Sequence, residues 1–226
     1  MRIYAETNFI LEYVFDQEQS RSCKNILSMV ELGVAELVIP AFSVGEAFGR
    51  LNRAHAGREA TAKPLRGTLA ELSRSALYEP FLEEAQRTLA FLVTAVDAEV
   101  RRYTSLRETL LKGARFAVLD GEVLRRADVL APRFGLEGPD AIVLASILAD
   151  LDIHPTAESC LIERDRDFGD PGIVAELKSR HCKVFFSFSS AEDALENRLK
   201  AREVRAREHC SWDGQHPAKN SASSGP

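Results

Sequence analysis

The sequence predicts an α/β protein whose central sheet is mainly parallel and is covered by helices on its faces. Short strand-like runs alternate along the chain with stretches of helical periodicity. Single acidic residues stand where several of these strands pass into helices, at the edge where the carboxyl ends of parallel strands meet. The region from about 50 to 112 has helical periodicity with little strand signal, which predicts a long helical insertion.

Apolar residues at strand or helix spacing define the elements of the first half. They predict a strand over 2–5, a helix over 10–15, a helix over 20–32, a strand over 35–40, and long helices from 51 to about 112. Thr7 or Asn8 can cap the first helix, and Gly33 suits the end of the second. Ser43 is a candidate cap for the helix that follows the second strand.

The second half continues this alternation. It predicts an extended segment over 116–119, a helix over 123–130, a loop over 134–139, an apolar helix over 141–149, a strand ending at Ile162, a helix over 172–180, a strand over 183–188 and a helix capped by Ser190 and running to about 207. The domain is expected to span 1–195, with the end of the last helix at 196–208. Residues 209–226 are rich in small and polar residues, and we expect them to be disordered.

Composition limits the classes of function. The chain of 226 residues is 45% hydrophobic and 28% charged, as in ordinary globular proteins. A net charge of −5 argues against nucleic-acid binding by bulk positive charge, but it allows a local basic patch. The four cysteines form no C-x-x-C pair and are expected to be reduced. The N-terminus does not resemble a signal peptide and no apolar run could span a membrane, so we expect a cytoplasmic protein.

The stretch 158–171 carries the densest acidic signal. Asp165, Asp167 and Asp170 directly follow a predicted buried strand, with Phe168 among them as an apolar anchor. Such closely spaced carboxylates repel one another unless a cation or solvent relieves them. The simpler interpretation is a solvated loop in which Asp170 caps the helix that Pro171 begins.

Other acids stand at equivalent junctions earlier in the chain. Glu6 ends the first predicted strand, Glu46 lies in the first turns of the helix after the second strand, and Asp140 opens the apolar helix. Each has a structural alternative. Glu6 could be a surface residue, Glu46 lies at capping-box spacing from Ser43, and Asp140 could cap its own helix.

Carboxylates gathered at one sheet edge predict a site for hard divalent cations. Mg²⁺ and Mn²⁺ prefer carboxylate oxygens, and the absence of histidine and cysteine at these positions argues against zinc. Hydrolysis of a phosphodiester is the chemistry most often built from such a cluster, because the metal lowers the pKa of a water molecule. The sequence has no Gly-x-x-x-x-Gly-Lys, Gly-x-Gly-x-x-Gly or Gly-x-Ser-x-Gly motif.

The start of the helical insertion is basic. Between residues 50 and 66 there is one acid, Glu59, among the cations Arg50, Arg53, Arg58, Lys63 and Arg66. This stretch could contact a phosphate backbone. It could equally be the solvated face of a helix.

Four short segments together resemble the PIN domain, the fold of many toxin–antitoxin ribonucleases and RNA-processing enzymes. They are residues 3–8 (IYAETN), 40–46 (PAFSVGE), 139–145 (PDAIVLA) and 161–168 (LIERDRDF). The resemblance covers both ends of a core running from residue 1 to about 190. It implies a three-layer α/β/α domain and a metal-dependent endoribonuclease acting on RNA.

The resemblance also implies roles for individual residues. One or two Mg²⁺ or Mn²⁺ ions would be held by Glu6, Glu46, Asp140 and Asp165, with Asp167 as an accessory acid and Asn8 orienting the first acid or a water molecule. A cognate antitoxin, another protein partner and a homodimer are all compatible with the family.

Two features depart from the family pattern, and other functions stay open. The first acid is usually aspartate, and the extra methylene of Glu6 could move a metal by about 1 Å. The helical insertion is longer than in compact toxin-type members and could serve as a substrate platform, a dimerisation arm or a partner site. The main alternative function is a non-catalytic PIN-like module that binds RNA or protein. A DNA-directed nuclease and a metal-dependent phosphatase are further alternatives.

Overall fold

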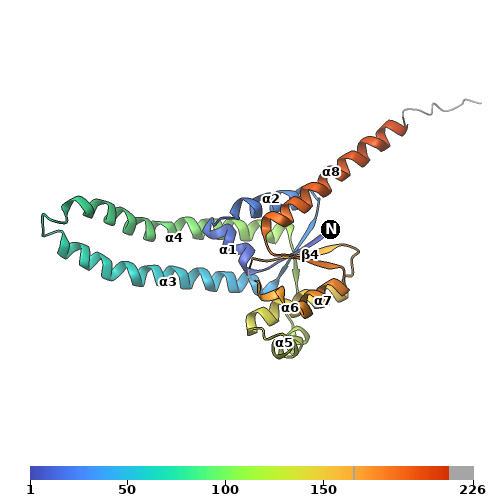
Figure 1. The fold of residues 1–226 in the computed structure, drawn as a ribbon, viewed down its shortest axis with the longest axis horizontal. Helices are drawn as coiled ribbons and strands as arrows, with labels where there is room; N and C mark the ends of the chain where they lie inside the picture. Colours follow the sequence, from blue (N-terminus) through green and yellow to red (C-terminus); the bar gives the residue numbers. More distant parts are fainter. Residues whose placement is uncertain (165, 214–226) are drawn as a thin grey trace, which may run out of the picture.

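A five-stranded, all-parallel sheet forms the centre of the computed structural model, which describes residues 1–164 and 166–213 (Figure 1). The strand order is β3-β2-β1-β4-β5. The strands are β1 (Arg2–Ala5), β2 (Glu36–Pro40), β3 (Arg115–Ala117), β4 (Ser159–Ile162) and β5 (Cys182–Phe185). The predicted α/β class and parallel sheet are confirmed, and the strand order is consistent with a PIN-like fold.

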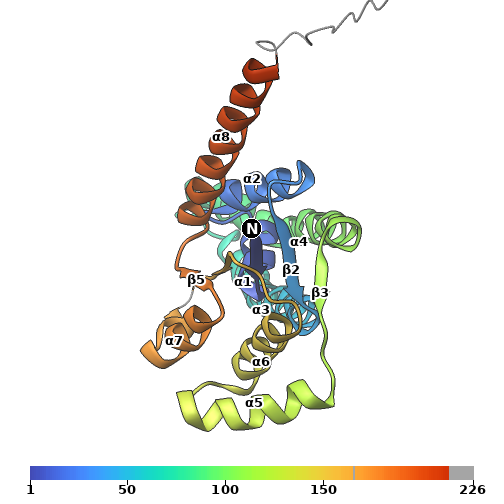
Figure 2. The ribbon, with the colours of Figure 1, turned by 90° about the vertical axis from the view of Figure 1, so that its right-hand side faces the viewer.

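Helices cover both faces of this sheet (Figure 2). The α-helices are α1 (Thr7–Phe15), α2 (Ser20–Glu31), α3 (Ala41–Leu72), α4 (Glu79–Gly113), α5 (Gly121–Phe134), α6 (Gly138–Ile153), α7 (Pro171–Ser179) and α8 (Phe188–Asp213), and the short 3₁₀ helix η1 spans Arg166–Gly169. The helices α1, α2 and α8 pack on one face together with the bases of α3 and α4. The helices α5, α6 and α7 pack on the other face.

Alternation along the strands explains these two layers, since successive side chains of a strand point to opposite faces. On β1, Ile3 and Ala5 are buried in the core beneath α1 and α2. Tyr4, between them, is buried in the core beneath α6. A strand buried on both faces reads as a continuous apolar run, as expected for a parallel sheet covered by helices.

The predicted helical insertion is a hairpin of two long helices, α3 and α4, that projects from the domain as an arm (Figure 1). The first helix begins at Ala41, directly after β2, and includes Ser43 as a buried interior residue. The prediction that Ser43 caps this helix is therefore wrong. The N-cap position is occupied by Pro40, the last residue of β2, which makes no side-chain capping bond.

The last strand and the last helix meet earlier than predicted. The strand β5 ends at Phe185, and Phe188 already begins α8, where its ring packs against Phe9 with centroids 5.5 Å apart. Ser187, not Ser190, caps the helix, since its hydroxyl accepts a hydrogen bond from the backbone N–H of Ser190 (3.1 Å). Helix α8 extends to Asp213, so residues 209–213 of the expected tail are helical, and 214–226 lie outside the described residues.

The three buried cysteines, Cys23, Cys160 and Cys182, are free thiols, as expected. Cys210 lies where the structure describes the backbone alone. Among the described residues, no helix is both long enough and apolar enough to cross a membrane.

A buried polar network ties the C-terminal half of α6 to the amino edge of the sheet. The Tyr4 hydroxyl donates to Asp150 (2.7 Å), and the Arg115 guanidinium donates to both oxygens of the same carboxylate. Burial by itself raises the pKa of Asp150, but the hydrogen bonds from Arg115 and Tyr4 outweigh it, and the net pKa is lowered. The carboxylate is therefore held in its charged form between three elements of the fold.

We expect Asp150→Asn to lower the free energy of unfolding by about 2 kcal/mol, because it removes the buried partner of Arg115 and leaves that cation paired with the more exposed Glu36 alone. The matched control is Asp152→Asn, two residues along the same helix. Asp152 is 44% exposed and pairs with Arg126 and Arg180 at the surface, so its loss should cost less than about 1 kcal/mol. Chemical denaturation of both variants measures the difference, and equal losses would contradict the role given to the network.

Candidate active site

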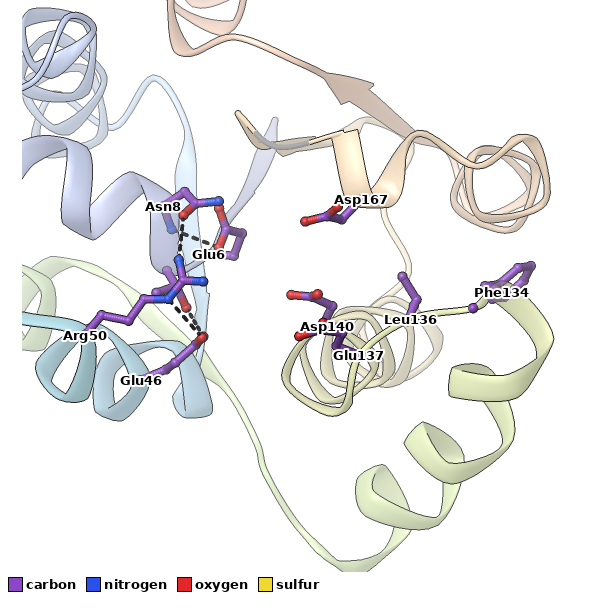
Figure 3. A pocket seen from close by; sticks show the side chains of 11 residues that line it. Glu6, Asn8, Glu46, Arg50, Phe134, Leu136, Glu137, Asp140 and Asp167 are labelled. Atoms are coloured by element: carbon purple, nitrogen blue, oxygen red, sulfur yellow. Dashed lines mark hydrogen bonds and ion pairs between the residues drawn. The ribbon is translucent and has the colours of Figure 1, made fainter. Parts of the chain in front are cut away.

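A pocket of about 440 Å³ opens at the carboxyl edge of the sheet, where the predicted acids gather (Figure 3). Its lining residues come from the start of α1, the first three turns of α3, the α5–α6 junction and η1: Glu6, Thr7, Asn8, Glu46, Arg50, Phe134, Gly135, Leu136, Glu137, Asp140 and Asp167. Segments more than 100 residues apart in sequence thus meet in one cavity. The prediction that Glu6, Asn8, Glu46, Asp140 and Asp167 lie together is met by this pocket.

Glu6 forms one wall and is buried, with 6% of its surface exposed. It follows the last residue of β1 and is the N-cap of α1, where its Oε2 accepts a hydrogen bond from the backbone N–H of Asn8 (2.8 Å). The prediction that Thr7 or Asn8 caps this helix is therefore wrong. The alternative that Glu6 is an ordinary surface residue is also wrong. A carboxylate at a helix N-terminus is stabilised in its charged form by the backbone N–H groups there.

Glu46 stands on the same wall and is fixed by Thr7 and Arg50. The Thr7 hydroxyl donates to its Oε2 (2.5 Å), and the Arg50 Nε lies 3.5 Å from its Oε1. Arg50 also donates to the side-chain oxygen of Asn8 (3.3 Å). Because Ser43 is not a cap, the capping-box explanation of Glu46 fails, and this carboxylate is held by Thr7 and Arg50 on its own side of the pocket.

Asp140 and Asp167 face this wall from the other side of the cavity (Figure 3). Asp140 lies in the first turn of α6. The N-cap residue of this helix is Glu137, whose side chain makes no capping hydrogen bond. Burial and, to a lesser degree, the nearby charges of Asp167, Glu46 and Glu137 together raise the pKa of Asp140 to about 6, against a smaller opposite effect of Arg50. The carboxylates therefore repel one another across the pocket.

The acidic stretch after β4 is partly as predicted. Phe168 is buried beneath α7 as an anchor, which leaves Asp167 on the pocket wall. Asp170 caps α7, since its Oδ1 accepts from the backbone N–H groups of Gly172 (2.7 Å) and Ile173 (3.3 Å). Asp165, the remaining predicted ligand, lies outside the described residues.

The donor set suits a hard cation. The carboxylates of the pocket offer oxygen ligands only, which is the chemistry that Mg²⁺ and Mn²⁺ prefer. In the part of the chain that the structure describes, no three acidic, histidine or cysteine side chains stand close enough to hold one metal ion together. Mg²⁺ commonly keeps several waters and binds through one or two carboxylates plus substrate phosphates, so the donors fit such an ion by type.

Sequence reasoning missed three residues of this region. Thr7 and Glu137 line the pocket. The sequence feature that could have indicated Thr7 is its position directly after Glu6, the acid at the end of the first strand. Glu163 directly follows β4 and is buried, with 1% of its surface exposed. Ala5 and Ile162 are paired at the ends of the adjacent parallel strands β1 and β4, and Glu6 and Glu163 directly follow them.

The basic residues of α3 divide into separate groups. Arg50 lines the pocket. Arg58 donates to both oxygens of the buried Glu99 (2.8 Å each) and stacks on Phe15, so it holds α3 to α4 and α1. Arg66 pairs with Glu59 on its own helix. Arg53 and Lys63 are exposed on the arm. A continuous phosphate track through all five residues would therefore require Arg58 to leave a buried carboxylate.

Searches against family models, curated proteins and solved structures found no match to this chain.

We expect Asp140→Asn to stabilise the protein by roughly 1 kcal/mol above about pH 6, after allowing for the partial exposure of the site. The pKa of this carboxyl is about 6 in the folded protein against an ordinary 3.8. Ionising Asp140 therefore favours unfolding, and the free energy of unfolding of the wild type falls as the pH rises from about 3.8 to about 6. Below pH 3.8 both proteins should be equally stable. Thermal unfolding across this pH range measures the effect. Asp128→Asn on the exposed side of α5 controls for the loss of one negative charge, and parallel profiles of wild type and Asp140→Asn would contradict the prediction.

Proposed function

We propose that the protein is a metal-dependent endoribonuclease that hydrolyses RNA phosphodiester bonds at this pocket. The observation that carries the proposal is the meeting of Glu6, Glu46, Asp140 and Asp167 around one cavity. Strand ends and helix starts far apart in sequence supply these acids, at the edge where open α/β sheets bind ligands. RNA as the substrate, rather than another phosphodiester, comes from the resemblance to PIN domains.

The proposed metal ligands are Glu6, Glu46 and Asp140, with Asp165 added by the resemblance. A bound Mg²⁺ or Mn²⁺ would neutralise the repulsion among these acids and supply a water molecule of lowered pKa. The chain's own contribution is to hold the carboxylates in place. The N-terminus of α1 fixes Glu6, and the Thr7 hydroxyl fixes Glu46. Asp167, which is exposed on the pocket wall, is the proposed accessory acid.

Arg50 is the proposed phosphate-binding residue. It is about half exposed, lines the pocket and pairs with Glu46 at 3.5 Å. A cation held at Glu46 would leave the Arg50 guanidinium free to donate to a substrate phosphate, for which the planar guanidinium is well suited. The contact between Arg50 and Asn8 (3.3 Å) keeps the guanidinium at the mouth of the site.

We expect Asp140→Asn to abolish RNA cleavage, because it removes one of the proposed metal ligands from a rigid buried helix. Cleavage of a labelled RNA in Mg²⁺ or Mn²⁺ measures activity, and calorimetry with the metal alone measures binding. Circular dichroism establishes that the variant is folded. Asp128→Asn should retain both metal binding and activity. Full cleavage by the folded Asp140→Asn variant would refute the assignment.

We expect Arg50→Ala to lower kcat/KM for RNA by roughly 10- to 100-fold, the value of one charge-assisted hydrogen bond to phosphate. Most of the change should lie in KM if the contact is made equally in the bound substrate and the transition state. Arg125→Ala, on the exposed surface of α5, is the matched loss of charge away from the pocket. Equal kinetics of the two variants would argue against a role for Arg50.

One observation favours the alternative of a non-catalytic RNA- or protein-binding module. Among the described residues the acids surround the cavity, and no three of them converge on one point. This alternative predicts RNA or protein binding without turnover at any metal concentration. A cleavage assay over a wide range of Mn²⁺ separates the two functions.

A further inference from the structure

Glu12 is a charged residue buried in the middle of α1, with 1% of its side chain exposed. A buried carboxylate is unfavourable unless it is paired and hydrogen-bonded. Its Oε1 accepts a hydrogen bond from the backbone N–H of Gln19, the N-cap residue of α2 (2.5 Å). Its Oε2 accepts a hydrogen bond from Nη1 of Arg164, far along the chain (2.5 Å). The two oxygens therefore serve two different contacts, one with α2 and one with the segment that follows β4.

Arg164 lies in the short segment that leads from β4 to the pocket. Glu163, just before it, still belongs to the sheet, since its backbone N–H donates to the carbonyl oxygen of Phe185 (3.0 Å). Asp167, on the pocket wall, is three residues after Arg164. Nη2 of Arg164 also lies 2.8 Å from the carboxylate of Glu18, which is 82% exposed. Arg164 thus attaches the start of this segment to one buried and one exposed carboxylate.

Helix α1 connects this ion pair with the opposite wall of the pocket. The N-terminus of α1 supplies part of that wall, including Glu6. Glu12 follows six residues after Glu6, about 9 Å further along the helix axis. Figure 3 shows Asp167 across the cavity from Glu6. The contacts that run from Glu6 through α1 to Glu12 and Arg164 therefore link the two sides of the cavity.

Stability alone does not require a charge at position 12. Apolar residues of similar size often stabilise a fold as well as a buried ion pair does. An ion pair instead fixes the geometry between two segments. In the part of the chain that the structure describes, no three acidic, histidine or cysteine side chains stand close enough to hold one metal ion together. The separation of the two walls therefore decides which carboxylates a hydrated cation reaches at once.

We propose that Arg164 is a positioning residue of the pocket, whose ion pair with Glu12 holds the segment of Asp167 at a fixed distance from the wall that α1 forms. Arg164 acts through this segment and not on the substrate. The inference rests on the proposed function in one respect, since the separation of the walls matters for a cation bound between them.

Calorimetry of the full chain with Mn²⁺ tests the proposal. We expect Glu12→Gln and Arg164→Ala each to weaken Mn²⁺ binding by roughly 10-fold, as removal of groups that orient metal ligands commonly does. The double variant should bind no more weakly than Arg164→Ala alone, because both changes break the same contact. Arg164→Lys keeps the positive charge and should recover part of the lost affinity.

Two control variants separate positioning from a general loss of stability. Glu18→Gln removes the exposed partner of the same arginine and should leave Mn²⁺ affinity unchanged. Arg102→Ala should also leave it unchanged, because Arg102 donates to the Val14 carbonyl of the same helix (2.6 Å) from the arm and not from the pocket wall. Glu12→Gln keeps an oxygen that accepts from the Gln19 N–H, so this variant should fold, and circular dichroism verifies it.

Hydrogen exchange of residues 166–169 without metal is a second measurement, which does not depend on the proposed function. We expect Glu12→Gln and Arg164→Ala to exchange several-fold faster there than the wild type, because the segment opens more often once the ion pair is broken. Unchanged exchange in the folded variants would overturn the proposal.

The two measurements together distinguish the remaining outcomes. Faster exchange with unchanged Mn²⁺ affinity would overturn the proposal, because the ion pair would then only stabilise the fold. Equal weakening of Mn²⁺ binding by Arg102→Ala would overturn it as well. A wild type that binds no Mn²⁺ would refute the proposed metal site, and hydrogen exchange would then decide by itself whether the ion pair holds the segment.

Discussion

The ion pair between Arg115 and the buried Asp150 fixes the helix that carries Asp140 to the pocket. Together with the Tyr4 hydroxyl it joins α6 to β1 and β3 at the amino edge of the sheet. Ten residues earlier on the same rigid helix, about 15 Å away, Asp140 reaches the carboxyl edge. A helix so fixed at one end, and buried along most of its length, delivers a carboxylate to the pocket with little freedom to move.

The pocket brings together carboxylates that repel one another. Burial and neighbouring carboxylates raise the pKa of Asp140, while Glu6 and Glu46 are held in place across the cavity by a helix N-terminus, a hydroxyl and Arg50. A fold that only needed stability would not assemble these groups. Perturbed carboxylates in a cavity are typical of functional sites, although structural ion pairs also perturb pKa values. Here the perturbing neighbours are themselves acids that line the same cavity, which is the arrangement that a bound cation would stabilise.

The two halves of the α3–α4 arm differ in how much of their surface is buried. Its inner half is well anchored. Tyr103 and Leu106 are buried in the core, and the buried Glu99 receives Arg58 and His55 from α3. Across residues 59–97, at its outer half, the buried side chains are Ala62 and Leu89 alone. A long hairpin with so few buried residues gains little from its own packing, since most helical stability in proteins comes from burial of an apolar face.

The sequence by itself determined the class of fold, the order of strands and helices along the chain, and the acids that stand at their junctions. These follow from local periodicity and from the geometry of parallel sheets, which the residues encode directly. The sequence could not decide which residues cap the helices. Glu6 replaces Thr7 as the cap of α1, and Ser43 is buried within α3, because the neighbouring strand and helix fix the chain direction at these junctions.

The end of β5 was decided by tertiary structure as well. Phe186 and Phe188 have strong strand propensity, but the contact of Phe188 with Phe9 beneath α8 outweighs it. Only the tertiary structure revealed the Asp150 network, the hydrogen bond from Thr7 to Glu46, and the pairing of Arg58 with the buried Glu99. Each joins residues at least 35 positions apart, a separation at which side-chain contacts leave no trace in local sequence pattern.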